Sequence, residues 1–96
     1  MRSFVAFYLF YTNFFMNIYV GNLNYRVREH DLRDLMEQFG IVDSVKVVKD
    51  RDTGRSKGFA FVEMQDDDAA NSAIEDLNEK EFEGRKLVVK EAIPRY

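Results

Sequence analysis

Three aromatic residues and one lysine occupy positions from which their side chains could bind a flat, negatively charged ligand. Residues Ile18–Val20 read IYV, and residues Lys57–Met64 read KGFAFVEM. If both segments are β-strands, alternate side chains point to opposite faces, and Phe59 and Phe61 then share a face with Lys57. Flat rings beside a cation suit single-stranded nucleic acid, because bases stack on rings and phosphates pair with cations.

The residue pattern predicts four strands and two helices that could hold these side chains in place. Runs of β-branched and aromatic residues predict strands at 18–20, 42–48, 57–64 and 87–90. Apolar residues at the i, i+3, i+4, i+7 spacing of a half-buried helix occur at Leu32, Leu35, Met36 and Phe39 and again at Ala70, Ala73, Ile74 and Leu77. We expect the first helix to end at Gly40 and the second to begin at the Asp66–Asp68 triplet. Residues 50–56 are predicted to form a hairpin loop.

The order β-α-β-β-α-β is typical of the α+β ferredoxin-like sandwich. We expect a four-stranded antiparallel sheet with both helices on one face, so that the other face is left uncovered. Strand alternation places on this open face the side chains of Tyr19, Lys46, Lys57, Phe59, Phe61, Glu63 and Lys90. Three rings left in water would each forgo roughly 1.5–3 kcal/mol of burial, which indicates a ligand.

Two short motifs resemble those of a known family. Ile18–Leu23 (IYVGNL) resembles the RNP hexamer, and Lys57–Met64 resembles the RNP octamer, of the RNA-recognition motif family. The likeness covers residues 17–92, and the layout is similar to small single-domain bacterial and organellar members. Met64 replaces the aromatic residue that usually ends the octamer, and strand alternation places Met64 in the core.

The resemblance implies a single-stranded RNA partner, with two or three bases stacked on Tyr19, Phe59 and Phe61 and a phosphate on Lys57. Because stacking accepts any base, sequence preference would come from hydrogen bonds at base edges, for which asparagines near the first strand are candidates. The predicted RNA-contacting residues are Asn17, Tyr19, Asn22, Lys46, Arg51, Arg55, Lys57, Phe59, Phe61 and Lys90.

Charge is distributed unevenly along the chain. The net charge is −3, yet residues 46–57 contain five basic and two acidic side chains, whereas residues 66–83 contain eight acidic side chains and one basic. We expect the basic segment beside the open face and most of the acidic segment behind the sheet. Such a layout would orient RNA toward the open face and keep non-specific affinity low.

Several function classes are excluded or disfavoured by composition. The chain has no cysteine and one histidine, which excludes a disulfide framework and a thiolate zinc site. No nucleophile–base pair or phosphate-binding loop is visible, so we predict a protein that is not an enzyme and has no cofactor and no metal. His30 is interpreted as a surface residue and Tyr25 as a packing residue of its loop.

The leading hypothesis is an RNA-binding protein that acts as an RNA chaperone or a post-transcriptional regulator. The alternative is a protein-interaction module of the same fold that docks a peptide on the sheet or on an acidic helix face. We expect a monomeric, cytoplasmic protein that binds no membrane. Single-stranded DNA remains open as a second partner.

Residues 1–15 differ from the rest, because they are rich in phenylalanine and tyrosine and Arg2 is their only charge. They resemble a signal-peptide core without a small-residue cleavage site, and they are shorter than the about 20 apolar residues of a spanning helix. Met16 could be the natural start, or the segment could pack on the domain and even cover the open face. We predict a disordered or artefactual leader at 1–15, one domain at 16–93 and a tail at 94–96.

Overall fold

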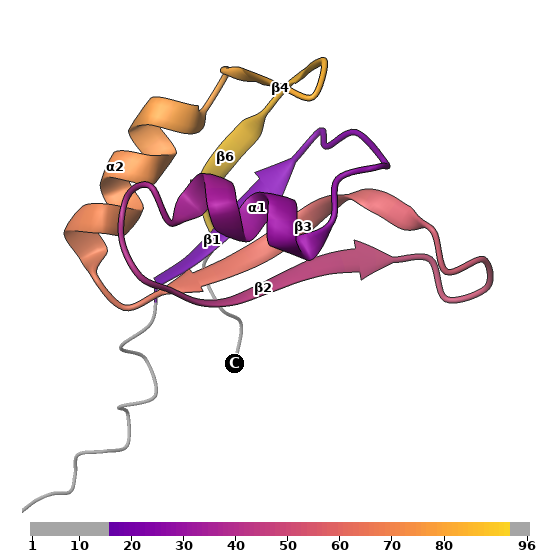
Figure 1. The fold of residues 1–96 in the computed structure, drawn as a ribbon, viewed down its shortest axis with the longest axis horizontal. Coiled ribbons are helices and arrows are strands. Elements are labelled where there is room, and N and C mark those ends of the chain that lie inside the picture. Colours follow the sequence, from indigo (N-terminus) through magenta and orange to yellow (C-terminus); the bar gives the residue numbers. More distant parts are fainter. Residues whose placement is uncertain (1–15, 93–96) are drawn as a thin grey trace, which may run out of the picture.

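A computed structural model describes residues 16–92, in which two helices lie on one face of a four-stranded antiparallel sheet (Figure 1). The helices are α1 (Glu29–Met36) and α2 (Asp67–Leu77). The strands of this sheet are β1 (Met16–Gly21), β2 (Val42–Lys49), β3 (Ser56–Met64) and β6 (Val88–Glu91). Their order is β2-β3-β1-β6, which puts the two motif-bearing strands side by side at the centre. The predicted α+β ferredoxin-like fold is confirmed.

Strand register decides which side chains enter the core. In the β1–β3 ladder Val20 lies opposite Ala60, and in the β2–β3 ladder Val47 lies opposite Ala60 from the other side. The core consists of alternate strand residues packed against the apolar faces of both helices, among them Ile18, Val20, Val47, Ala60, Val62, Met64, Val89, Leu32, Met36, Ala70, Ala73 and Leu77. Met64 is fully buried, as predicted for the residue that ends the octamer.

Helix α1 ends earlier than its apolar spacing predicts. The helix stops at Met36, and Phe39 lies in the following turn, where it packs on the core. Gly40, where the helix is predicted to end, lies four residues beyond its last residue and is not among the residues with positive φ. A Cβ added at Gly40 would lie only 2.7 Å from the Cβ of Ala69. The glycine therefore allows the turn to approach the start of α2 closely.

A short hairpin that the sequence did not predict precedes the last strand. Strands β4 (Glu81–Phe82) and β5 (Arg85–Lys86) pair with each other in a second, two-stranded sheet. The two residues between them, Glu83 and Gly84, have φ values of 51° and 81°. Two successive left-handed residues are typical of a type I′ turn, for which Asn-Gly and Asp-Gly are the usual sequence signals. The sequence predicts a turn at residues 83–85 that leads into the last strand, but it does not predict that the residues on either side of this turn pair as strands.

Residues 1–15 and 93–96 lie outside the described residues. The predictions of a leader at 1–15 and a tail at 94–96 concern those segments. Within residues 16–92, neither helix combines the length and the apolar character that crossing a membrane requires.

The N-terminus of α2 is capped as predicted. The Asp66 carboxylate accepts hydrogen bonds from the backbone N–H groups of Asp68 at 2.9 Å and Ala69 at 3.3 Å. Because Asp66→Ala removes this acceptor, we expect it to lower the free energy of unfolding by about 1 kcal/mol. Glu75→Ala removes the same charge from the helix without touching the cap, and should cost less than about 0.5 kcal/mol. Urea denaturation measures both variants, and equal losses would contradict the capping role.

Candidate nucleic-acid interface

Tyr19, Phe59 and Phe61 form an aromatic cluster on the sheet face opposite the helices. The ring centroid of Tyr19 lies 5.8 Å from those of both phenylalanines, and the two phenylalanine centroids are 6.1 Å apart. The cluster forms because Tyr19 lies opposite Phe61 in the β1–β3 ladder. Phe59 precedes Phe61 by two residues in β3, so its side chain lies on the same face of the sheet. The structure thus brings together the three rings that strand alternation places on one face.

The rings of the aromatic cluster shield one another from water. Phe61 is 38% exposed, whereas Tyr19 and Phe59 are half-buried. The interplanar angles of 62° and 88° that Phe61 makes with its neighbours are the edge-to-face arrangement that aromatic pairs favour. Burial of a fully exposed ring would contribute roughly 1.5–3 kcal/mol, and this figure overestimates the burial free energy that half-buried Tyr19 and Phe59 forgo.

Gly21 and Lys90 determine where the Tyr19 ring lies. A Cβ added at Gly21 would be 2.5 Å from the Tyr19 Oη and 2.7 Å from its Cε2, so the ring occupies the space that glycine leaves free. Lys90 is the partner of Tyr19 in the β1–β6 ladder, and its Nζ lies 5.5 Å from the ring centroid. A cation–π contact of this kind contributes about 0.5–1 kcal/mol at an exposed site.

Two more predicted residues lie next to the aromatic cluster. Asn17 is paired with Glu63 in the β1–β3 ladder, and exposed Lys46 is paired with Phe61 in the β2–β3 ladder. The Glu63 carboxylate accepts a hydrogen bond from the Ser44 hydroxyl at 2.7 Å. The open face consequently combines a partnered carboxylate with an amide and an exposed lysine beside the rings.

Asn22 has structural partners that the sequence did not indicate. Its Nδ2 donates to the backbone carbonyl of Lys86 at 2.7 Å, and its Oδ1 accepts from Nη2 of Arg85 at 2.8 Å. Both polar groups of the side chain are thus engaged by β5, and the residue joins the end of β1 to the hairpin. Contact of Asn22 with a base edge stays a prediction, and it would require exchange of these hydrogen bonds.

The loop between β2 and β3 is organised by the carboxylate of Asp50. This group accepts hydrogen bonds from the backbone N–H groups of Asp52 at 2.8 Å and Thr53 at 3.2 Å. The backbone N–H of Asp50 donates to the carbonyl of Arg55 at 2.7 Å, which closes the loop. Exposed Arg51 and Arg55 lie on this loop, which extends beyond the end of the sheet (Figure 1).

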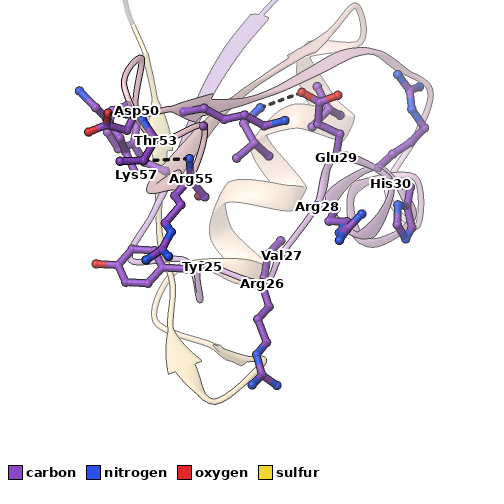
Figure 2. A pocket seen from close by; sticks show the side chains of 17 residues that line it. Tyr25, Arg26, Val27, Arg28, Glu29, His30, Asp50, Thr53, Arg55 and Lys57 are labelled. Atoms are coloured by element: carbon purple, nitrogen blue, oxygen red, sulfur yellow. Dashed lines mark hydrogen bonds between the residues drawn. The ribbon is translucent and has the colours of Figure 1, made fainter.

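A groove lies between residues 25–30, at the start of α1, and the β2–β3 loop (Figure 2). Its volume is about 1520 Å³, and its lining includes Lys57 and Phe59, so it reaches the aromatic cluster. Tyr25, interpreted as a packing residue of its loop, lines this groove and is 65% exposed. Sequence reasoning also missed four cations of the lining, Arg26, Arg28, Arg33 and Lys49.

Comparisons with known proteins agree on one family. The family model of the RNA recognition motif matches residues 18–88. The protein RbpD of Nostoc sp. strain PCC 7120 is 49% identical over 80 residues, which are 83% of this chain and 85% of that protein. RbpA of Synechocystis sp. strain PCC 6803 is 48% identical over 80 residues, 83% of this chain and 79% of that protein.

Solved structures resemble the chain over the same region. A crystal structure of RNA Binding Protein PG1 is 63% identical with a TM-score of 0.81, and the match covers 84% of this chain and 98% of that one. A structure of the Rna15 RRM with bound RNA (GU) is 34% identical with a TM-score of 0.72, and covers 79% of this chain and 81% of that one.

The Asp50 carboxyl makes the loop sensitive to acid. Hydrogen bonds from the N–H groups of Asp52 and Thr53, aided by the positive charge of Lys57, lower the pKa of Asp50 below its usual value. A carboxyl with a lowered folded-state pKa stabilises above its unfolded pKa, and this contribution is lost as the pH falls through the folded pKa. We expect the loop hydrogen bonds to persist at neutral pH and to weaken only at a pH below the ordinary titration range of an aspartate.

An NMR titration of the Asp52 and Thr53 amide shifts measures this transition. Asp50→Asn, which has no carboxyl to protonate, is the control and should abolish the transition. A midpoint above the ordinary aspartate range would contradict the assignment.

Gly21→Ala should displace the Tyr19 ring without unfolding the protein. The added methyl group meets the far end of the Tyr19 side chain, which can swing outward. We therefore expect the free energy of unfolding to fall by about 1 kcal/mol or less. The ring-current shifts of the Lys90 methylenes should change in the NMR spectrum. Gly40→Ala introduces the same atom against Ala69, and should cost more stability while leaving the Lys90 shifts in place. Unchanged Lys90 shifts in Gly21→Ala would refute this account.

Proposed function

Because the chain belongs to the RNA recognition motif family, we propose that it binds single-stranded RNA by stacking bases on the aromatic cluster. The observation that carries the proposal is the meeting of Tyr19, Phe59 and Phe61 on the face of the sheet that the helices leave open. These residues occupy the two motif strands, β1 and β3, at the centre of the sheet.

The stacking surface is sufficient for weak binding by one domain. Each stacked base contributes about 1–3 kcal/mol, and domains of this kind stack two or three bases. The lost translational freedom and the ordering of the RNA must be subtracted from the sum. The remainder corresponds to a Kd on the order of micromolar. The exposed ring of Phe61 would contribute most, because Tyr19 and Phe59 offer only the parts that their neighbours leave free.

The cations around the rings supply contacts for phosphates. Lys46, Lys57 and Lys90 are exposed, and none of them takes part in an ion pair within residues 16–92. Few such contacts predict a shallow salt dependence, with about 0.7 counterions released per neutralised phosphate of a single strand. Unpaired cations around aromatic rings favour a nucleic acid over a docked peptide, which has no need of them.

The relatives support RNA as the ligand, since one solved relative carries the name RNA Binding Protein and another is described with bound RNA. We propose a non-enzymatic role for this chain as an RNA chaperone or post-transcriptional regulator. The same proposal has it act as a monomer in the cytoplasm and allows single-stranded DNA as a second ligand.

Replacing Phe59 and Phe61 together by alanine should weaken RNA binding at least about tenfold, because two stacking contacts are lost. Fluorescence anisotropy with a labelled random-sequence RNA measures the Kd, and thermal melting shows that the variant is folded. Ile41→Ala is the matched control, since Ile41 is 79% exposed, apolar and located between α1 and β2. An unchanged Kd in the double variant would exclude stacking as the mechanism.

A further inference from the structure

We infer that the groove beside the sheet binds the phosphates of a second segment of the same RNA strand, next to the bases stacked on the aromatic cluster. We call it the basic groove, and its cationic residues are Arg26, Arg28, Arg33, Lys49, Arg55 and Lys57. The inference rests on the proposed function and extends it to residues outside the sheet face.

The basic groove is continuous with the aromatic cluster. Phe59 lines the groove, and its ring centroid is 5.8 Å from that of Tyr19 in the cluster. Lys57 also lines the groove, beside Arg55 of the β2–β3 loop. In Figure 2 Arg55 and Lys57 lie on one side of the groove, and Arg28 and His30 lie across from them. Because Phe59 belongs to both surfaces, we expect a strand with one base on Phe59 to continue into the groove.

The charge of the groove differs from that of the chain. Six of the 14 lysines and arginines line it, against two of the 17 acidic residues, in a chain of net charge −3. The two acids are Glu29, which accepts from the backbone N–H of Val47 at 3.2 Å, and Asp50, which organises its own loop. Both carboxylates thus accept hydrogen bonds from the backbone. Because six cations face two acids, the electrostatic potential of the groove favours an anion.

Within residues 16–92, the side chains of most cations of the groove have no hydrogen-bond or ion-pair partner. Arg33 donates to the carbonyl of Val42 at 2.9 Å and lies 3.7 Å from the Glu37 carboxylate. By contrast, within residues 16–92 no side-chain hydrogen bond or ion pair engages Arg26, Arg28, Lys49 or Arg55. Arg26 points away from the other labelled side chains in Figure 2. Of the cations without such a partner, this leaves Arg28, Lys49 and Arg55 as the lining residues that we expect to hold phosphates.

Tyr25 provides a position for one more base in the groove. Its ring rests against Gly58, where an added Cβ would be 3.2 Å from the Tyr25 Cε1. The guanidinium carbon of Arg85 lies 5.9 Å from the ring centroid, and Arg85 is itself held by Asn22. A ring that is 65% exposed and lines a groove rich in cations matches the stacking platforms of single-strand binding proteins.

The test uses an RNA of about four bases, enough for the two or three that stack on the sheet, with and without an extension of about six abasic nucleotides. Abasic nucleotides add phosphates but no bases, so the extension offers nothing that could stack on the aromatic cluster in another position. We expect the extension to tighten binding about tenfold at low salt and to steepen the salt dependence by about 0.7 per contacted phosphate.

The variant Arg28→Gln/Lys49→Gln should lose most of this gain and bind the unextended RNA as the wild type does. Lys80→Gln/Lys86→Gln is the matched control, because it removes two positive charges outside the groove and should keep the gain. Anisotropy titrations over a range of salt concentrations measure each Kd, and circular dichroism verifies that both variants are folded.

Each negative result has a distinct meaning. No gain from the extension in the wild type, or equal losses in both double variants, would overturn the groove as a phosphate site. An oligoglutamate peptide that shifts the amides of the groove in NMR spectra, when the abasic extension shifts none, would assign the groove to a protein partner and overturn it as well. If the unextended RNA does not bind at all, the proposed function itself fails.

Discussion

The β1–β3 ladder is the constraint on which the whole candidate interface depends. Tyr19 lies opposite Phe61 and Val20 opposite Ala60, so each residue pair is committed to one face of the sheet. A slip of one residue would turn the rings of one strand into the core and expose its aliphatic residues. Because the inward residues of both strands are almost completely buried, core packing fixes the register and thereby the position of the rings.

Mutual shielding gives the rings a second property that matters for binding. Three rings in edge-to-face and tilted contact restrict one another's rotation before any ligand arrives. A preorganised surface loses less side-chain entropy on association than three independent rings would. The same contacts remove part of the apolar area from water, which moderates the tendency of an open aromatic face to aggregate.

Sequence periodicity was sufficient to predict the four-stranded sheet, the two helices and the shared face of the three rings, because each depends on a repeat of two or of 3.6 residues. It failed at Phe39, since a residue at the i+7 position is equally well buried from a turn as from a helix. It also failed at the β4–β5 hairpin, where Glu83 adopts a left-handed conformation that its residue type does not announce. Local propensity carries no information about such positions, which the surrounding structure decides.

The basic groove was beyond prediction for a different reason. Its cations come from separate segments of the chain, and isolated arginines and lysines are ordinary in loops. The recognisable charge excess lay in residues 46–57, from which Arg51 and Arg55 were predicted as contacts. Arg28 stands outside that segment, and Lys49, although inside it, was not assigned a contact. The hydrogen bond between Asn22 and Arg85 joins residues 63 positions apart, and no local pattern marks it.

The space above Gly21 makes the mutational tolerance of two positions interdependent. A side chain at position 21 competes with the Tyr19 ring for the same volume, so alanine there is unfavourable only while position 19 holds a large ring. In a variant with a small residue at position 19, glycine would no longer be required at position 21. The effects of the two substitutions on the free energy of unfolding would then be non-additive. Laboratory evolution of this surface would then have to change the platform and its neighbour together.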